Sequence, residues 1–158
     1  MRVNIHTNSQ SIELITKNGS QKWPISTAAR GLGEGKGSYC TPRGAHIVRA
    51  RIGAGCPINT VFVGRRPTGE IYTPELGRAE LGRDWILTRI LWLSGREVGF
   101  NRLGDCDTMQ RYIYIHGTPD ESFEPIPRSH GCIRMRNADL IALFDQVPAG
   151  TPVFITEE

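Results

Sequence analysis

Residues 86–93, Ile-Leu-Thr-Arg-Ile-Leu-Trp-Leu, are apolar at nearly every position and strongly limit how the chain can fold. They show no alternation between a polar and an apolar face, which is typical of a strand buried on both sides. Such a strand needs packed layers on each of its faces. The 158 residues are enough for one domain with a hydrophobic core, so we expect residues 1–158 to form a single domain.

Several other segments predict short strands separated by turns. Asn18-Gly19 is a strong hairpin signal, and 18 glycines and 10 prolines suit a chain of strands and turns better than a helical bundle. The glycine-rich stretch 31–37 lacks the strand and helix of a phosphate loop, so we expect a surface loop there. The predicted strands, besides 86–93, are 3–5, 12–15, 23–26, 46–52, 61–63, 112–116 and 151–155.

One substantial helix is predicted, directly after residue 136. Asn137 is a plausible N-cap, and Asp139 places a negative charge in the first turn. Pro148 ends the segment. The apolar stripe of this helix consists of Leu140, Leu143, Phe144 and Val147. The sequence therefore predicts a mostly β domain with one main helix.

Charge and hydropathy exclude several classes of function. The formal net charge is +3 and the basic residues are scattered, so no nucleic-acid surface is indicated. No stretch approaches the roughly 18 apolar residues that cross a bilayer. The first ten residues lack the apolar core of a secretory signal, so we expect a cytoplasmic protein. The alternative is a periplasmic protein whose export signal lies outside this sequence.

Four cysteines are present, and they lie far apart. Because no Cys-x-x-Cys pair occurs, a zinc knuckle is not predicted, and we expect neither a metal nor a cofactor. Cys40, Cys56 and Cys106 are interpreted as free thiols that pack as small hydrophobic residues. Cys132 has different surroundings.

Cys132 has the partners that a nucleophilic thiol needs. A thiol attacks as thiolate, so it needs a base or stabilising amides. His116 ends a predicted strand in which Tyr112, Tyr114 and His116 share one face. Gly131 leaves room for a substrate, and its N–H can pair with that of Cys132 as an oxyanion hole. From these residues alone, a buried Cys beside a hydrogen-bonded His stays an open alternative.

Three segments together carry a family resemblance. His116-Gly117-Thr118 followed by Ser129-His130-Gly131-Cys132-Ile133-Arg134-Met135 resembles the active-site signature of the L,D-transpeptidase catalytic domain (the YkuD-type family). Thr41-Pro42-Arg43-Gly44 is similar to an upstream turn of that family. The resemblance extends from about residue 2 to residue 156.

The resemblance implies a β-sandwich of mixed sheets, with one main helix after the catalytic cysteine and a flexible loop over the cleft. Cys132 would be the nucleophile and His116 the general base, with the Gly117 carbonyl orienting the imidazole. Arg134 would bind a substrate carboxylate or brace the loop; both alternatives stay open. The remaining residues that the resemblance places at the site are Ser129, His130 and Gly131, which would shape the pocket and the oxyanion hole. Tyr112 and Tyr114 are interpreted as lining the cleft beside His116, with simple packing as the alternative.

The same resemblance implies a substrate and a reaction. The family acts on peptidoglycan stem tetrapeptides or muropeptides, cleaving between the third residue, usually meso-diaminopimelate, and D-Ala. Water as acceptor gives an L,D-carboxypeptidase, whereas a second stem gives a 3→3 cross-link and a free D-amino acid gives exchange. For a cytoplasmic protein we expect the carboxypeptidase, in recycling, with cross-linking or exchange outside the membrane as the alternative. Carbapenems are expected to acylate the thiol.

Two rival classes are tested by the same residues. A papain-like or cell-wall endopeptidase places its Cys before its His, and no His follows Cys132 here, so that order is excluded. A non-catalytic wall-binding module would not need Cys132 and His116 with a glycine beside each. His6 and His46 lie in predicted strands and are interpreted as structural.

Overall fold

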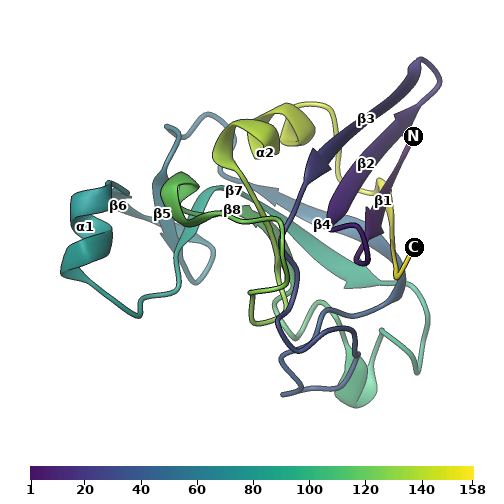
Figure 1. The fold of residues 1–158 in the computed structure, drawn as a ribbon. Helices are drawn as coiled ribbons and strands as arrows, with labels where there is room; N and C mark the ends of the chain where they lie inside the picture. Colours follow the sequence, from purple (N-terminus) through teal and green to yellow (C-terminus); the bar gives the residue numbers. More distant parts are fainter.

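The computed structural model describes residues 1–158 as a curled, mostly β domain (Figure 1). Its strands are β1 (Arg2–His6), β2 (Ser11–Thr16), β3 (Gly19–Pro24), β4 (Gly44–Ile52), β5 (Thr60–Val63), β6 (Arg66–Ile71), β7 (Ile86–Gly95), β8 (Tyr114–Gly117), β9 (Ile133–Met135) and β10 (Pro152–Thr156). Its helices are α1 (Pro74–Ala79), α2 (Asn137–Phe144) and the 3₁₀ turns η1 (Gly104–Cys106) and η2 (Asp120–Ser122).

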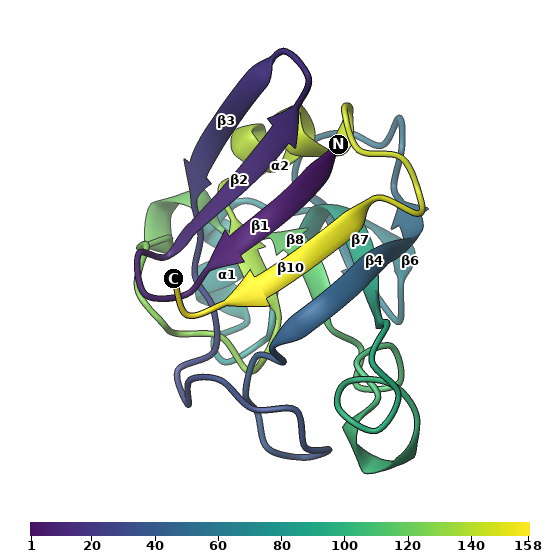
Figure 2. The same cartoon turned by 90° about the vertical axis from the view of Figure 1, so that its right-hand side faces the viewer.

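All ten strands belong to one mixed sheet. Its main order is β3-β2-β1-β10-β4-β7-β5-β6, and β8 and β9 extend from β7. The β1–β10 and β8–β9 pairs are parallel. Figure 2 shows β3, β2, β1, β10 and β4 side by side, with α2, β7 and β8 behind them. The two layers expected of a sandwich are thus parts of one continuous sheet that curls over itself.

The main core fills the space inside this curl. Eighteen buried side chains form it, and fourteen of them come from β1, β2 and β10 on one side and from β7, β8, β9 and α2 on the other. The other four are Val48 of β4 and the loop residues Ile25, Ile113 and Val147. β7 is buried along nearly its whole length, because its side chains pack in clusters on both faces: Leu91 and Leu93 belong to the main core, and Ile90 belongs to a cluster with Phe62 and Tyr114. The expectation of a doubly covered strand at 86–93 is confirmed.

The sequence placed most elements within one or two residues, but it missed β6, β9 and α1 and misplaced two strands. The strand expected at 23–26 is the end of β3, which occupies 19–24. Tyr112 precedes β8 instead of belonging to it, because its φ of 57° turns the chain there. Helix α1 was not predicted, although Thr73 caps it by accepting a hydrogen bond from the Leu76 N–H and Pro74 occupies its first turn.

The predicted N-cap of the main helix was wrong by one residue. Arg136 holds the cap position, and the Asn137 side chain points into the protein instead of capping. The helix start is satisfied from outside, since a carboxylate oxygen of Asp120 accepts the Asn137 N–H at 3.2 Å. No helix of the structure has the length and apolar character needed to cross a membrane.

Candidate active site

The ends of β8 and β9 build a cleft that holds the cysteine and the histidine. These strands pair in parallel, with His116 directly opposite Arg134, and Cys132 lies one residue before β9. The cleft has a volume of about 490 Å³. The residues that line it are Gly64, Arg65, Asp84, Ile86, Arg111, Tyr112, Ile113, Tyr114, His116, Ser129, His130, Cys132 and Arg134.

The imidazole of His116 is buried and held in one tautomer. Its Nδ1 lies 2.6 Å from the Gly117 carbonyl oxygen, which can only accept, so Nδ1 must carry the proton. Nε2 therefore keeps a lone pair. Burial lowers the pKa of His116 below its ordinary value, although the Gly117 carbonyl acts in the opposite direction. At neutral pH the ring is an uncharged base.

The thiol of Cys132 is half-buried and sits between two backbone groups. Sγ accepts a hydrogen bond from the Tyr114 N–H at 3.4 Å and donates to the Tyr112 carbonyl at 3.4 Å. Burial raises the pKa of Cys132 to about 12, while the Tyr114 N–H lowers it in part. The resting pair is consequently a neutral thiol and a neutral imidazole, in one cleft but without a hydrogen bond between them.

In the turn at Ser129–Cys132, the Gly131 amide that was expected to help form an oxyanion hole is already hydrogen-bonded. The Ser129 hydroxyl donates to the Cys132 carbonyl at 2.6 Å and accepts the Gly131 N–H at 3.2 Å. An oxyanion hole made with the Gly131 N–H is therefore not available in this arrangement. The amides without a hydrogen-bond partner are those of His130 and Cys132. His130 itself is exposed, with its ring 6.3 Å from that of Tyr39.

Gly131 is required by the backbone of this turn. Its φ is +132°, and an added Cβ would lie 3.2 Å from Ile113 Cδ1 and 3.3 Å from the Cys40 carbonyl oxygen. The upstream Thr41–Gly44 turn supports it, because the Thr41 hydroxyl donates to the Gly131 carbonyl at 2.9 Å. The same hydroxyl accepts the Ala28 N–H at 3.0 Å. Segments far apart in sequence thus hold the loop that carries Cys132.

Arg134 lies beside His116 and faces one acidic residue. Its Nη2 is 3.5 Å from the Asp84 carboxylate, and Asp84 is exposed. This is a loose ion pair that leaves hydrogen-bonding capacity on both groups. Both proposed roles, binding a carboxylate and bracing the loop, fit this position.

Arg111 is a cleft residue that the sequence did not reveal. Its guanidinium is half-buried and donates to the carbonyl of Cys40 at 2.6 Å and, at 3.3 Å each, to the carbonyl of Gly33 and the hydroxyl of Ser38. None of these acceptors is charged, so its positive charge is not neutralised. Its position directly before Tyr112 was the one available signal.

Arg65 was also missed, and it too lines the cleft. It stacks over Trp92 and Tyr112, with its guanidinium carbon 4.6 and 5.0 Å from the ring centres. It also donates to the Tyr114 hydroxyl at 3.0 Å. Tyr112 and Tyr114 thus contact one cation at the mouth of the cleft, although Tyr112 does not belong to the strand in which it was expected to share a face with Tyr114.

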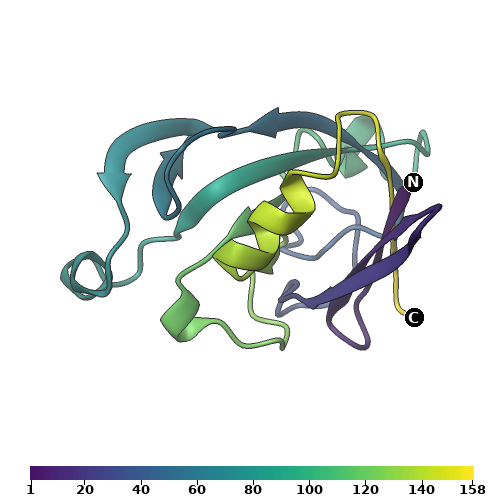
Figure 3. The ribbon, with the colours of Figure 1, turned by 90° about the horizontal axis from the view of Figure 1, so that it is seen from above.

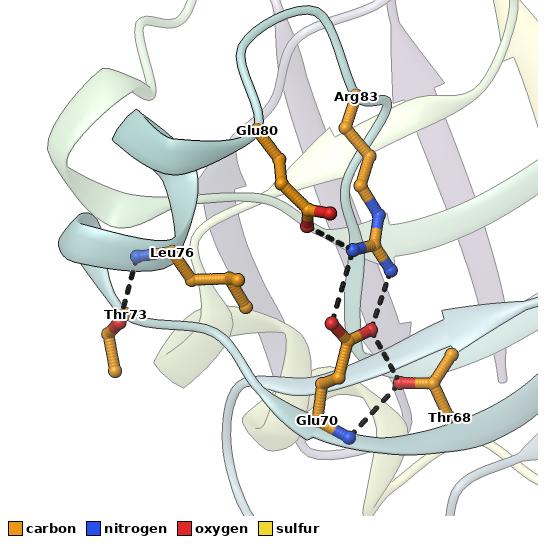
Figure 4. Close-up of polar contacts among 6 residues, drawn as sticks. All are labelled: Thr68, Glu70, Thr73, Leu76, Glu80 and Arg83. Carbon is orange, nitrogen blue, oxygen red and sulfur yellow. Dashed lines mark hydrogen bonds and ion pairs between the residues drawn. The ribbon is translucent and has the colours of Figure 1, made fainter.

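The segment between Gly64 and Asp84 projects from the body of the domain (Figures 1 and 3). Residues at its two ends, Gly64, Arg65 and Asp84, line the cleft. Figure 4 shows how it is closed: Arg83 donates to Glu70 at 2.7 and 3.2 Å and to Glu80 at 2.5 Å. Arg83 also lies over the Trp85 ring at 4.4 Å. This cluster connects β6, the end of α1 and the start of β7.

The other histidines and cysteines lie outside the cleft. His46 is fully buried and hydrogen-bonded to Thr108 at 2.9 Å, and His6 contacts Glu13 at 3.4 Å. Cys56 packs against the cluster around Phe62. Cys40 and Cys106 are also free and partly buried.

Comparison with known proteins places this site in context. A segment of 66 residues, 42% of the chain, is 41% identical to the putative L,D-transpeptidase YqjB of Bacillus subtilis and covers 36% of it. A segment of 48 residues, 30% of the chain, is 44% identical to the probable L,D-transpeptidase YbiS of Escherichia coli K12 and covers 16% of it. The matched segments thus span a minor part of both relatives.

Solved structures share the fold. The crystal structure of L,D-transpeptidase 3 from Mycobacterium tuberculosis superposes with a TM-score of 0.58 at 14% identity, over 98% of this chain and 60% of that one. The sequence model of the L,D-transpeptidase catalytic domain (YkuD) matches residues 1–155. With a mostly β curled sheet around the cysteine cleft, the chain belongs to the YkuD family of L,D-transpeptidase catalytic domains.

Proposed function

We propose that the protein is a cysteine acyltransferase that cleaves the L,D bond before the terminal D-Ala of peptidoglycan stem tetrapeptides. The observation that carries this proposal is the pairing of an uncharged His116, whose Nε2 is free to accept a proton, with the Cys132 thiol in one cleft. The amides of His130 and Cys132 are free to bind an oxyanion.

The first half-reaction follows from these groups. As Sγ of Cys132 attacks the carbonyl carbon of the third residue, its proton moves to Nε2 of His116. Because burial opposes both charged forms, the proton moves during the attack and no stable ion pair forms beforehand. Collapse of the tetrahedral intermediate breaks the C–N bond, and the imidazolium returns the proton to the leaving amine of D-Ala.

The charges of the cleft support an anionic peptide as substrate. Three guanidinium groups, those of Arg65, Arg111 and Arg134, face the cleft with Asp84 as its one carboxylate. The stem peptide carries carboxylates on its terminal D-Ala and on diaminopimelate. A guanidinium binds a carboxylate through paired hydrogen bonds, which places the scissile bond relative to Cys132.

We further propose that water resolves the thioester, which makes the protein an L,D-carboxypeptidase acting on recycled muropeptides in the cytoplasm. The half-buried position of Cys132 supports access by water. His116 would take a proton from that water and return it to Sγ as the tripeptide leaves. A 3→3 cross-linking or exchange reaction is the second candidate, supported by the names of YqjB and YbiS as L,D-transpeptidases.

Incubation with a purified disaccharide tetrapeptide, followed by mass spectrometry, tests the proposal. We expect a tripeptide product and free D-Ala, and a stable carbapenem adduct on Cys132. Cys132→Ala should abolish both, whereas Cys106→Ala, a second partly buried thiol, should abolish neither. A cross-linked tripeptide–tetrapeptide dimer as main product would replace hydrolysis by transpeptidation. Full turnover by Cys132→Ala would refute the mechanism.

A further inference from the structure

A buried polar network lies behind the catalytic histidine, centred on Asn137 at the start of α2. The Asn137 side chain is fully buried. Its Nδ2 donates to the Thr118 carbonyl at 2.9 Å, to Asp120 Oδ1 at 3.1 Å and to Asn59 Oδ1 at 3.2 Å. Its Oδ1 accepts the Thr88 hydroxyl at 2.5 Å. One side chain therefore ties together four segments that are distant in sequence.

Thr88 occupies an unfavourable backbone conformation in the middle of β7. Its φ is +77°, which is rare for a β-branched residue, and its side chain is completely buried. Its hydroxyl is fully used, because it accepts the Asn59 N–H at 3.0 Å while donating to Asn137. Arg89 holds the Thr88 carbonyl from the other side at 2.6 Å. A strained residue persists only where its surroundings fix it, and here they do.

The strained residue forms a bulge in β7, between the residues that pair with Gly117 and with His116. Leu87 pairs with Gly117 and Ile90 pairs with His116, so Thr88 and Arg89 are extra residues against one step of β8. Bulges beside active sites commonly redirect a neighbouring side chain. This bulge determines which atoms surround Gly117.

Gly117 is wedged between the bulge and Asn137. A Cβ built on Gly117 would lie 2.6 Å from the Leu87 carbonyl oxygen and would overlap Asn137 Oδ1. Asn137 also binds the carbonyl of the next residue, Thr118, so it restrains the chain on both sides of the Gly117 carbonyl. That carbonyl fixes the tautomer of His116.

We propose that Asn137 and Thr88 are positioning residues that place the Gly117 carbonyl and thereby hold His116 in its Nδ1–H tautomer. Neither residue lines the cleft, so neither contacts the substrate. The inference rests on the proposed role of His116 as base. Without the network, Nδ1 loses a fixed acceptor, both neutral tautomers become populated, and Nε2 is a base for only part of the time. Loss of the Gly117 hydrogen bond also lowers the pKa of His116 further.

Two substitutions at Thr88 separate the hydroxyl from the shape of the side chain. Thr88→Val keeps the branched shape and removes the hydroxyl, and Thr88→Ser does the reverse. For Thr88→Val we expect the rate of carbapenem acylation of Cys132 to fall about 10- to 100-fold with little change in apparent affinity. The acid limb of its rate–pH profile should move to lower pH, and ¹⁵N NMR of His116 should show mixed tautomers. Thr88→Ser should keep the wild-type tautomer and nearly the wild-type rate.

Other outcomes overturn the inference. A folded Thr88→Val protein with the wild-type rate and a pure Nδ1–H tautomer would refute it, as would an equal rate loss in both variants with an unchanged tautomer. If Thr88→Val does not fold, Asn137→Ser is measured below its melting temperature with the same two readouts and the same criteria. The NMR measurement needs no peptide substrate, so it tests the positioning role separately from the proposed function. If the tetrapeptide is not cleaved but Thr88→Val shows mixed tautomers and Thr88→Ser does not, the proposed function is refuted and the positioning role stands.

Discussion

Gly117→Ala is the substitution whose cost can be worked out most directly from the structure. The added methyl would stand 2.6 Å from the Leu87 carbonyl oxygen, whereas ordinary contact begins at 3.4 Å. The methyl would therefore be about 0.8 Å too close, and β7 and β8 would have to separate by about that distance. The obstacles are a backbone carbonyl and the buried Asn137, neither of which can swing aside as a flexible side chain would.

Both stability and catalysis should respond to this displacement. Overpacking of this kind costs about 1–3 kcal/mol. For a domain of this size each kcal/mol lowers the melting temperature by about 2–4 °C, so we expect a loss of about 2–12 °C. Because a misplacement near 1 Å in a catalytic group costs about 100-fold in rate, acylation of Cys132 should fall by a similar factor.

Thermal melting followed by circular dichroism and carbapenem acylation followed by mass spectrometry measure the two effects. Gly35→Ala is the matched control, because a Cβ there would meet nothing nearer than Ser38 Cβ at 4.0 Å. We expect the control to melt and react as the wild type does. A Gly117→Ala protein that melts with the wild type and reacts at its rate would show that Gly117 is not wedged as described.

Three further predictions follow from charge and burial. Because burial raises the pKa of Cys132 to about 12 and lowers that of His116, alkylation of Cys132 by iodoacetamide should keep rising beyond about pH 9. A rate plateau near neutral pH would instead reveal a thiolate–imidazolium pair. Burial lowers the pKa of His46 to about 4. Between this pH and the ordinary pKa of a histidine, the imidazole is therefore protonated in the unfolded chain and neutral in the folded protein. In urea unfolding, the free energy of unfolding of the wild type should fall as pH drops through this range. His46→Gln should lose about 2–3 kcal/mol less than the wild type by pH 4.5. An equal dependence of the unfolding free energy on pH in both proteins would contradict this. Arg83→Ala removes the ion pairs with Glu70 and Glu80, which are partly exposed, so the melting temperature should change little. Amide hydrogen exchange should become faster within residues 66–83. Unchanged exchange there would show that the ion pairs do not stabilise this projecting segment.

Eight of the ten strands and the main helix were predictable, at least in part, because their signals are local. Alternation, a doubly apolar stretch and a helical stripe each lie within about ten residues of sequence. The short helix α1 buries no residue, so it has no apolar stripe to detect, and its Thr73-Pro74 start was the usable signal. Asn137 looked like a cap for the same local reason, and its long-range partners overrode that role.

The site was predictable as a set of residues and less so as a geometry. The cysteine and histidine segments could be recognised from short motifs. The amides left free near Cys132 depend on which way the Ser129 hydroxyl turns, and no sequence pattern shows this. Arg65 lies between β5 and β6, far in sequence from Cys132, yet it lines the same cleft. Thr88 hydrogen-bonds to Asn137, which is 49 positions away in the sequence. Such contacts are created by the fold itself.

The placement of β10 has a consequence for how the chain reaches this fold. β10 lies between β1 and β4, so it alone joins the hairpin of the first 24 residues to the rest of the sheet (Figure 2). During synthesis β1 is made long before β10, so the edge of β1 that pairs with residues 152–156 stays open until those residues are made. Such long-range closure slows folding and leaves an unpaired edge exposed during synthesis. The two halves of the sheet can therefore join only after residues 152–156 have left the ribosome.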